Sequence, residues 1–323
     1  MDRPTPRPAT EVPADRLLEL VHGLRAELLL REESPSGAWV EETAERLRRG
    51  ETPGWSLPSA PAGGLAFYNR RGREAFGHVH VESGAAGGAR SSALATALLD
   101  SLPADVASID LGFTGLTTEE EGELLGELGR RPGSTVVHRE AMERPIGPDD
   151  AAPLGPLPPG VRHAPVRDIT LDALADLDVR AFRGSEDELL IGGTVADYRR
   201  VLETLVDGGM GRFLDEASTT LLETEPLRLV GALLTAEQSP RRAVYLDFIV
   251  DPERHGRGHG RYLLQWGFRA LWALGYERVR LWVTVSNATA LHLYREVGFR
   301  RTATAVIYRW SRAGAGPQPQ ASR

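Results

Sequence analysis

The chain has 323 residues, of which 41% are hydrophobic and 26% are charged, and its formal net charge at pH 7 is −7. This composition is typical of a folded globular protein, the length suits two domains, and the negative charge argues against a protein that neutralises nucleic-acid phosphates. Cysteine is absent, which excludes disulfides, thiolate catalysis and cysteine-bound metal.

The sequence shows no candidate for a membrane segment or a secretion signal. No apolar run reaches the ~18 residues that a membrane span needs, and the first 16 residues lack the apolar core of a signal peptide. We therefore expect a cytoplasmic protein whose partners include neither a nucleic acid nor a membrane. Composition leaves a monomer and a homodimer open.

Residues 1–143 alternate between helical and strand patterns. Helical periodicity comes first, in ADRLLELVHGLRAELLL and AWVEETAERLRR, followed by a strand hairpin in GLAFYNRRGREAFGHVHVE. A loop then enters a helix in SGAAGGARSSALATALLDSL. The strand ASIDLGF, the helix EEEGELLGELG and the strand STVVHREAMERPI complete this half.

Residues 144–160, RPIGPDDAAPLGPLPPG, are rich in proline and glycine. Because these residues disfavour both helices and strand ladders, the segment predicts a linker between two domains.

Residues 161–312 repeat the order of elements found in the first half. Helical segments and strands lead to a nearly continuous apolar strand, RAVYLDFIV, of the kind buried on both faces. The loop DPERHGRGH, the helix GRYLLQWGFRALWALG, the alternating strand RVRLWVTV, a short helix and a last strand follow. The chain therefore predicts two copies of one α/β (α+β) fold, with a disordered tail at residues 313–323.

The glycine-rich loop after the apolar strand predicts an anion site. Gly256, Gly258 and Gly260 let the backbone approach a ligand closely, and the helix that begins there directs its unpaired N–H groups and its positive dipole end outward. Arg254, Arg257 and Arg261 surround the loop with positive charge. A pyrophosphate fits best; the alternative is a plain turn with solvated arginines.

Two segments, VDPERHGRGHGRYLL and VSNATALHLYREVGF, together resemble the GNAT superfamily of acyl-CoA-dependent N-acyltransferases. The resemblance spans roughly residues 161–310. The loop of that superfamily reads Arg or Gln, two residues, Gly, one residue, then Gly or Ala. Here His255 replaces the Arg or Gln, while Gly258 and Gly260 match, and the change is expected to be tolerated because the loop acts through its backbone.

The resemblance implies two tandem GNAT-like domains, each a mixed, mostly antiparallel sheet flanked by helices, and acetyl-CoA as acyl donor. The apolar strand and RVRLWVTV would splay apart around the thioester, with an N–H near Val250 stabilising the oxyanion. The implied donor-binding residues are Phe248, Ile249 and Val250 for the pantetheine arm, His255, Gly256, Arg257, Gly258, His259, Gly260 and Arg261 for the pyrophosphate, and Asn287.

Tyr294 matches the tyrosine that protonates the departing thiolate in this superfamily. A phenol suits that task because it is neutral at pH 7 and can hydrogen-bond the sulfur as it leaves. Tyr294 could equally be a core residue, and Asn287 could serve only as the N-cap of its helix.

Asp247 interrupts the apolar strand just before the point of splay and is the candidate general base, because desolvation there would raise its pKa. It could instead accept loop hydrogen bonds or recognise a cationic substrate. Some superfamily members carry a Glu where this chain has Val244, and His292, Glu237 and a water relay stay open. His78 and His80 lack a third ligand, so no metal is expected.

The first half keeps only part of the motif. Gly87 and Gly88 are present, but Arg90 or a neighbour takes the place of the second motif glycine, and no Asn or Tyr matches Asn287 or Tyr294. A tandem layout with a degenerate first copy is similar to that of mycothiol synthase, a similarity of layout more than of residues. We expect a non-catalytic first copy that walls part of the acceptor cleft, with residual CoA binding left open.

These residues predict an N-acetyltransferase that transfers an acyl group directly to a primary amine, since no cysteine can carry it. A small-molecule acceptor is the first expectation, with residues 182–198, FRGSEDELLIGGTVADY, as the wall of its site. The alternatives are acetylation of a protein N-terminus or lysine, and a non-catalytic acyl-CoA-binding module.

Overall fold

The computed structural model describes residues 5–30, 37–57, 63–82, 84 and 86–312. They form two compact units, the first comprising Met1–Val137 and Val306–Arg323 and the second comprising His138–Ala305. The predicted tail at residues 313–323 lies outside the described residues. No helix in the described part is long and apolar enough to cross a bilayer.

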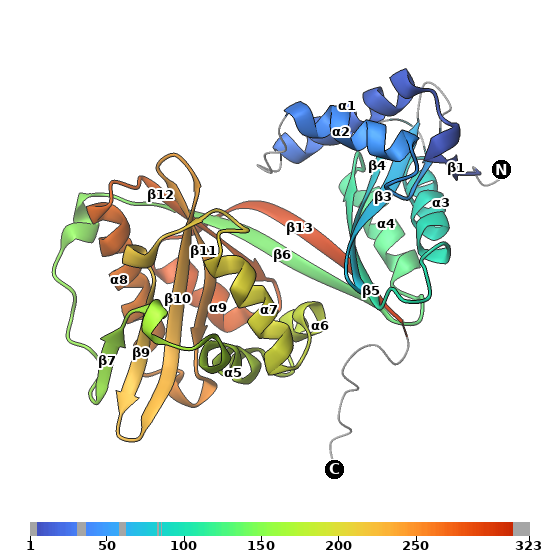
Figure 1. The fold of residues 1–323 in the computed structure, drawn as a ribbon. Coiled ribbons are helices and arrows are strands. Elements are labelled where there is room, and N and C mark those ends of the chain that lie inside the picture. Colours follow the sequence, from blue (N-terminus) through green and yellow to red (C-terminus); the bar gives the residue numbers. More distant parts are fainter. Residues whose placement is uncertain (1–4, 31–36, 58–62, 83, 85, 313–323) are drawn as a thin grey trace, which may run out of the picture. The chain divides into compact units, whose positions relative to one another are not determined.

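Unit 1 is a sheet with helices on both faces (Figure 1). Strands β2, β3 and β4 are antiparallel, and β4 pairs in parallel with β5 across the crossover helix α3. One core lies under α3 and α4, and a second lies under α1 and α2. The elements are β1 (Arg7–Pro8), η1 (Ala9–Glu11), α1 (Ala14–Leu30), α2 (Gly37–Arg48), β2 (Gly54–Leu57), β3 (Gly64–Arg71), β4 (Glu74–Val81), α3 (Gly87–Asp100), β5 (Ser108–Thr114) and α4 (Thr118–Leu128).

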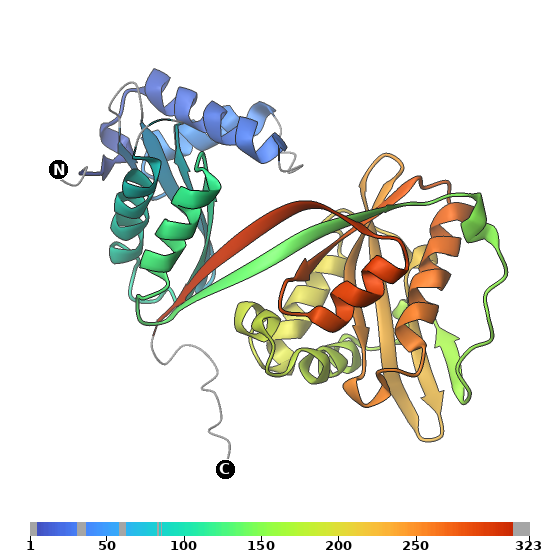
Figure 2. The ribbon, with the colours of Figure 1, turned by 180° about the vertical axis from the view of Figure 1, so that it is seen from behind.

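Unit 2 has the same plan and a longer sheet, in the order β6-β12-β11-β10-β9-β7. Helices α8 and α9 pack on one core and α5 and α7 on another, one on each face of the sheet (Figures 1 and 2). The elements are β6 (Ser134–Pro145), η2 (Pro148–Ala151), β7 (Val161–Ala164), η3 (Val166–Asp168), α5 (Leu171–Phe182), α6 (Glu186–Ile191), α7 (Val195–Val206), β8 (Arg212–Phe213), η4 (Asp215–Ala217), β9 (Thr219–Thr224), β10 (Leu227–Ser239), β11 (Arg242–Val250), η5 (Pro252–Arg254), α8 (His259–Ala273), β12 (Arg278–Thr284), α9 (Ala288–Glu296) and β13 (Arg300–Ser311).

The two halves exchange their closing strands. Strand β6, which ends the first half, pairs antiparallel with β12, and the end of β13 pairs antiparallel with β5. The units therefore divide the chain differently from the expected domains 1–143 and 161–312, since residues 138–143 belong to unit 2 and residues 306–312 to unit 1. Strands β5 and β12 are equivalent edges, so either closing strand can complete either sheet, and local patterns do not distinguish the two pairings.

The expected linker, residues 144–160, carries more structure than its composition predicts. Strand β6 continues to Pro145, and the helical turn η2 follows. The guanidinium of Arg144 holds this turn, since it donates to both carboxylate oxygens of Asp150 (3.0 and 2.7 Å) and to the carbonyl of Val297 (2.8 Å). The linker is therefore anchored to unit 2 at its first residues.

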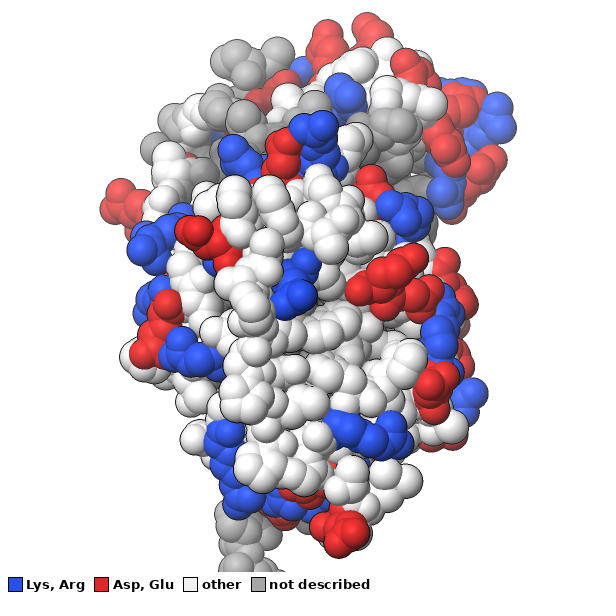
Figure 3. All heavy atoms as spheres, turned by 90° about the vertical axis from the view of Figure 1, so that its left-hand side faces the viewer, with Lys and Arg blue, Asp and Glu red and all other residues white. Residues whose placement is uncertain are grey.

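Figure 3 shows the face of the molecule on the side of β7 and the linker. Uncharged side chains fill its centre, and acidic and basic side chains are interspersed toward its margins. A surface that binds a nucleic-acid backbone carries clustered arginine and lysine. On the face shown, the described residues do not form such a cluster.

Candidate active site

Strands β11 and β12 part toward their carboxyl ends. They pair in parallel only between Arg242–Val244 and Arg278–Arg280, although β11 continues to Val250 and β12 to Thr284. Strand β10 stays paired with β11 as far as Val250, with a bulge opposite Leu234 and Thr235. The outer edge of Phe248–Val250 is therefore turned toward the gap between the strands, where an extended ligand could add hydrogen bonds.

A buried carboxylate holds the loop that follows β11. Asp251, whose side chain is 1% exposed, accepts hydrogen bonds from Arg180 (3.2 Å) and Arg228 (2.7 Å). Its other oxygen accepts from the backbone N–H of Glu253 (3.0 Å). Arg254, which the sequence placed among the charges around an anion, is instead paired with Glu223. The loop is thus fixed from outside, independently of any ligand.

The loop backbone is open at the start of α8. Gly256 and Gly258 have positive φ angles (+74° and +86°), and a Cβ at either would meet nothing within 4 Å. Gly258 is the N-cap of α8 and offers no side-chain acceptor for the first amide groups of the helix. These groups and the helix dipole can therefore act on an anionic ligand.

The two loop histidines lie in different environments. The ring of His255 is exposed and its Nε2 lies 3.1 Å from the carbonyl oxygen of Val250. His259 is 3% exposed, and burial lowers the pKa of its imidazole, which keeps the ring neutral. Neither ring nitrogen of His259 has a hydrogen-bond partner among the described residues. Arg257 is exposed, and Arg261 pairs with Glu296.

Tyr294 lies in the core beneath the parted strands. Its side chain is 6% exposed, and its ring packs against Phe248 and Phe299, with centroid distances of 5.8 and 5.7 Å. Burial and the negative charges of Asp247 and Asp187 raise the pKa of the phenol. Tyr294 therefore stays protonated at neutral pH, as a proton donor must.

Asp247 forms a carboxyl pair with Asp178 of α5, which the sequence analysis missed. Asp178 is 2% exposed, and its carboxyl group lies close enough to that of Asp247 for each to act on the pKa of the other. Burial raises the pKa of both carboxyl groups, and the charge of Asp247 raises that of Asp178 further. Because two adjacent buried carboxylates cannot both ionise readily, the pair retains a proton. The signal was an acid on the buried face of α5, four residues after Leu174.

A second polar group reaches the parted strands from α6 and β6. Asp187, within the segment expected to form the acceptor wall, accepts a hydrogen bond from Thr284 at the end of β12 (2.8 Å). Arg139 lies opposite Thr284 in the β6–β12 ladder, and its Nη2 is 4.0 Å from Asp187. Arg139 was not predicted as a site residue, because its strand was expected to close the sheet of the first domain.

The other candidate residues have structural partners. The side chain of Asn287 caps α9 by accepting from the N–H of Ala290 (3.1 Å), which is its expected structural role; donor binding stays a prediction. Glu237 bonds Arg212 and Tyr276 and pairs with Ala243, at the opposite end of β11 from the gap. His292 is 77% exposed and lies beside Glu296. Glu237 therefore lies away from the gap, and His292 stays an exposed side chain of α9.

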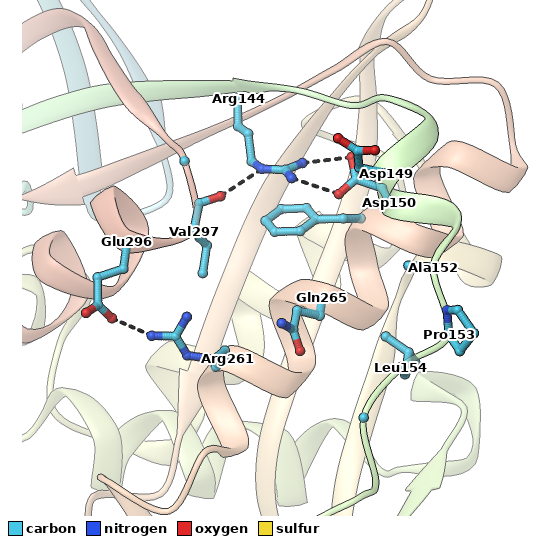
Figure 4. Close-up of a pocket in the computed structure, with 13 residues that line it drawn as sticks. Arg144, Asp149, Asp150, Ala152, Pro153, Leu154, Arg261, Gln265, Glu296 and Val297 are labelled. Carbon is cyan, nitrogen blue, oxygen red and sulfur yellow. Dashed lines mark hydrogen bonds and ion pairs between the residues drawn. The ribbon is translucent and has the colours of Figure 1, made fainter.

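A separate pocket of about 420 Å³ lies where the linker meets α8 and α9 (Figure 4). The guanidinium of Arg144 lies over the ring of Phe268, 4.0 Å from its centroid, and bonds Asp150. Arg261 and Glu296 form an ion pair on the side of the helices. This pocket contains none of the residues at the gap between the strands.

The gap thus combines parted parallel strands, a glycine loop at a helix N-terminus, a buried tyrosine and a carboxyl pair. A family model described as Acetyltransferase (GNAT) family matches residues 188–299. Mycothiol acetyltransferase of Geodermatophilus obscurus is 30% identical to this chain, over 84% of this chain and 88% of its own length. Mycothiol acetyltransferase of Thermobispora bispora is 31% identical, over 63% of this chain and 68% of its own length. A GCN5-related N-acetyltransferase structure from Sphaerobacter thermophilus has a TM-score of 0.57 at 19% identity and covers 98% of this chain and 97% of its own.

The chain belongs to the GNAT family of acetyltransferases. It is an acetyl-CoA-dependent N-acetyltransferase, which confirms the enzyme class expected from the two motifs. The likeness to the solved structure covers both halves and confirms the fold class, a mixed, mostly antiparallel sheet flanked by helices.

Proposed function

We propose that this enzyme transfers the acetyl group of acetyl-CoA directly to the primary amine of a small molecule. The observation that carries the proposal is the gap between β11 and β12, where Tyr294 and the Asp178–Asp247 pair come together. The names of the relatives, mycothiol acetyltransferases, support a small-molecule acceptor.

The open loop would hold the donor. Its pyrophosphate would lie on the backbone N–H groups of His255–Arg261, and the pantetheine arm would pair with the outer edge of Phe248–Val250. Asn287 would contact the arm or the backbone beside it. Positive φ angles and open space at Gly256 and Gly258 support this placement.

In the proposed reaction the amine nitrogen attacks the carbonyl carbon, the C–S bond breaks, and an amide and free CoA form. Asp247 would take the proton that the amine loses, with Asp178 close behind it. Tyr294 would give its proton to the departing sulfur, and an N–H near Val250 would stabilise the acyl oxygen. Tyr294 is protonated at neutral pH, which the role of acid requires, and its ring packs against Phe248 of β11 at the gap.

Release of free thiol from acetyl-CoA in the presence of a panel of small amines tests the proposal. Turnover with at least one amine, with the acetylated amine identified by mass spectrometry, is the expected result. Acetylation of peptide N-termini or lysines without turnover of any small amine would contradict a small-molecule acceptor. Tight acetyl-CoA binding without turnover of amines or peptides would favour a binding module.

A further inference from the structure

Arg139 is a cation whose hydrogen-bonding capacity is incompletely used. Its Nη2 is 3.4 Å from the carbonyl oxygen of Trp282 and 4.0 Å from Asp187, and its Nε is buried without a hydrogen-bond partner among the described residues. The side chain keeps 29% of its surface exposed. A guanidinium carries five N–H donors, so this one can still accept an anionic partner.

Asp187 is not a sufficient counter-ion for Arg139. One of its carboxylate oxygens already accepts the hydrogen bond of Thr284 at 2.8 Å, and the same oxygen is the one 4.0 Å from Arg139. A tight arginine–carboxylate pair has N···O distances of ~2.7–2.9 Å, often in two parallel bonds. The contact between Arg139 and Asp187 is therefore a longer-range electrostatic attraction. The parallel N–H donors of the guanidinium stay available to a second carboxylate.

Arg139 belongs to the surroundings of the reacting groups. Its charge lowers the pKa of the Tyr294 phenol, against the effects of burial and of Asp247. In the order β6-β12-β11, Arg139 and Asp247 lie on strands two positions apart, with Thr284 on the strand between them. Paired strands are ~4.8 Å apart, so these two strands are at least ~10 Å apart. The gap therefore has a cation on one side and a carboxyl pair on the other.

We propose that Arg139 binds a carboxylate of the acceptor, so that the acceptor is a compact amine bearing a carboxylate near its amino group, as in an amino acid. The inference rests on the proposed function and specifies its substrate class. The amine of such a molecule would point to Asp247 and its carboxylate to Arg139. Each end of such a molecule would be held by a hydrogen bond of ~2.8 Å.

The test compares kcat/KM for an amino acid with that for its carboxamide, using the amino acid that the enzyme acetylates fastest in a panel. The unaltered enzyme should prefer the acid. Arg139→Gln should lower kcat/KM for the acid about 100-fold, because it removes the cation of a partly buried pair, and should change the value for the amide less than about threefold. Arg139→Lys should restore part of the activity toward the acid, since it keeps the charge and loses the fork.

Arg199→Gln is the matched control, because Arg199 is an exposed arginine of α7 that pairs with Asp172 and Glu203. It should leave both acceptors unaffected. Equal losses for acid and amide in Arg139→Gln, or no preference for the acid in the unaltered enzyme, would overturn the inference while leaving transfer to small amines intact. No turnover of any small amine, together with no amino-acid binding to the CoA complex by calorimetry, would overturn both.

Discussion

The two units share a glycine-containing loop before a crossover helix, but the surroundings of that loop differ. In each, a glycine-containing loop leads into the N-terminus of the helix that crosses over to a parallel strand, α3 in unit 1 and α8 in unit 2. Each helix begins after an N-cap residue with a left-handed backbone, Ala86 (φ +63°) and Gly258 (φ +86°). What differs is the source of the charge that faces the helix.

In unit 1 the chain itself supplies that charge. The carboxylate of Glu120, at the start of α4, lies against the first residues of α3, so that a Cβ added at Gly87 would be 2.8 Å from its Oε1. The guanidinium of Arg90 donates to the carbonyl groups of Gly63 (3.1 Å) and Glu82 (2.9 Å) and fixes the loop from within. The carboxylate of Glu120 thus occupies the space in front of the α3 N-terminus that a phosphate would use.

In unit 2 the corresponding side chains point elsewhere. Arg254 is paired with Glu223 and Arg261 with Glu296, and Asp251 fixes the loop from the side of β10 and α5. A helix N-terminus is available to an anionic ligand only where the chain leaves its amide groups uncapped. We therefore expect one donor site per chain, in unit 2.

The largest expected effect concerns the acid that unit 1 lacks. If Tyr294 is the proposed proton donor for the thiolate, Tyr294→Phe removes only that donor and should lower kcat about 100-fold while leaving the Kd for acetyl-CoA unchanged. A thiol-release assay measures kcat, and calorimetric titration measures the Kd for acetyl-CoA. Tyr262→Phe in α8 serves as the matched control. An unchanged kcat would be compatible with an acetyltransferase but would contradict the proposed role of Tyr294 as its acid.

The next largest effect concerns the loop backbone. Gly258→Val should raise the Kd for acetyl-CoA about 30-fold, because a β-branched residue with positive φ costs ~1–2 kcal/mol and its side chain keeps a phosphate from the amide groups. Ala86→Val, the equivalent change in unit 1, should leave the Kd unchanged. Equal effects of the two substitutions would show that both loops contribute to donor binding.

A third effect is the pH dependence of stability that the carboxyl pair introduces. The folded state holds the Asp178 proton to a higher pH than the unfolded state, whose reference pKa is 3.8. The free energy of unfolding should therefore be largest below about pH 4. It should decrease as pH rises above that value, by at most ~1.4 kcal/mol per pH unit for one proton. Asp178→Asn should remove this slope in urea titrations between pH 7 and 8, whereas below that range Asp247, whose pKa burial raises to about 6, still contributes. An unchanged slope between pH 7 and 8 in Asp178→Asn would contradict the shared proton.

The smallest expected effect is at the helix of unit 1. Glu120→Gln removes the negative charge at the N-terminus of α3 and should lower the melting temperature by a few degrees at most, without changing kcat or the Kd for acetyl-CoA. Differential scanning calorimetry and the thiol-release assay measure these outcomes. A second molecule of acetyl-CoA bound by Glu120→Gln would show that the carboxylate had been occupying a functional donor site.

Local patterns predicted the parts of the site that lie close together in the sequence. The glycine loop before α8, the apolar strand β11 and the helix with Tyr294 each have a period or a motif of their own. The exchange of β6 and β13 has no local signal, since it depends on which of two equivalent sheet edges a strand meets. Arg139 was missed for that reason. Asp178 was missed because only tertiary contact shows that its helix turns it toward Asp247.

Calorimetric titration of the whole chain with acetyl-CoA tests the central claim most directly. We predict one molecule bound per chain, with an affinity weakened by Gly258→Val and unaffected by Ala86→Val. Two molecules bound per chain, or a single site that Gly258→Val leaves intact, would contradict the assignment of the donor site to the loop of unit 2.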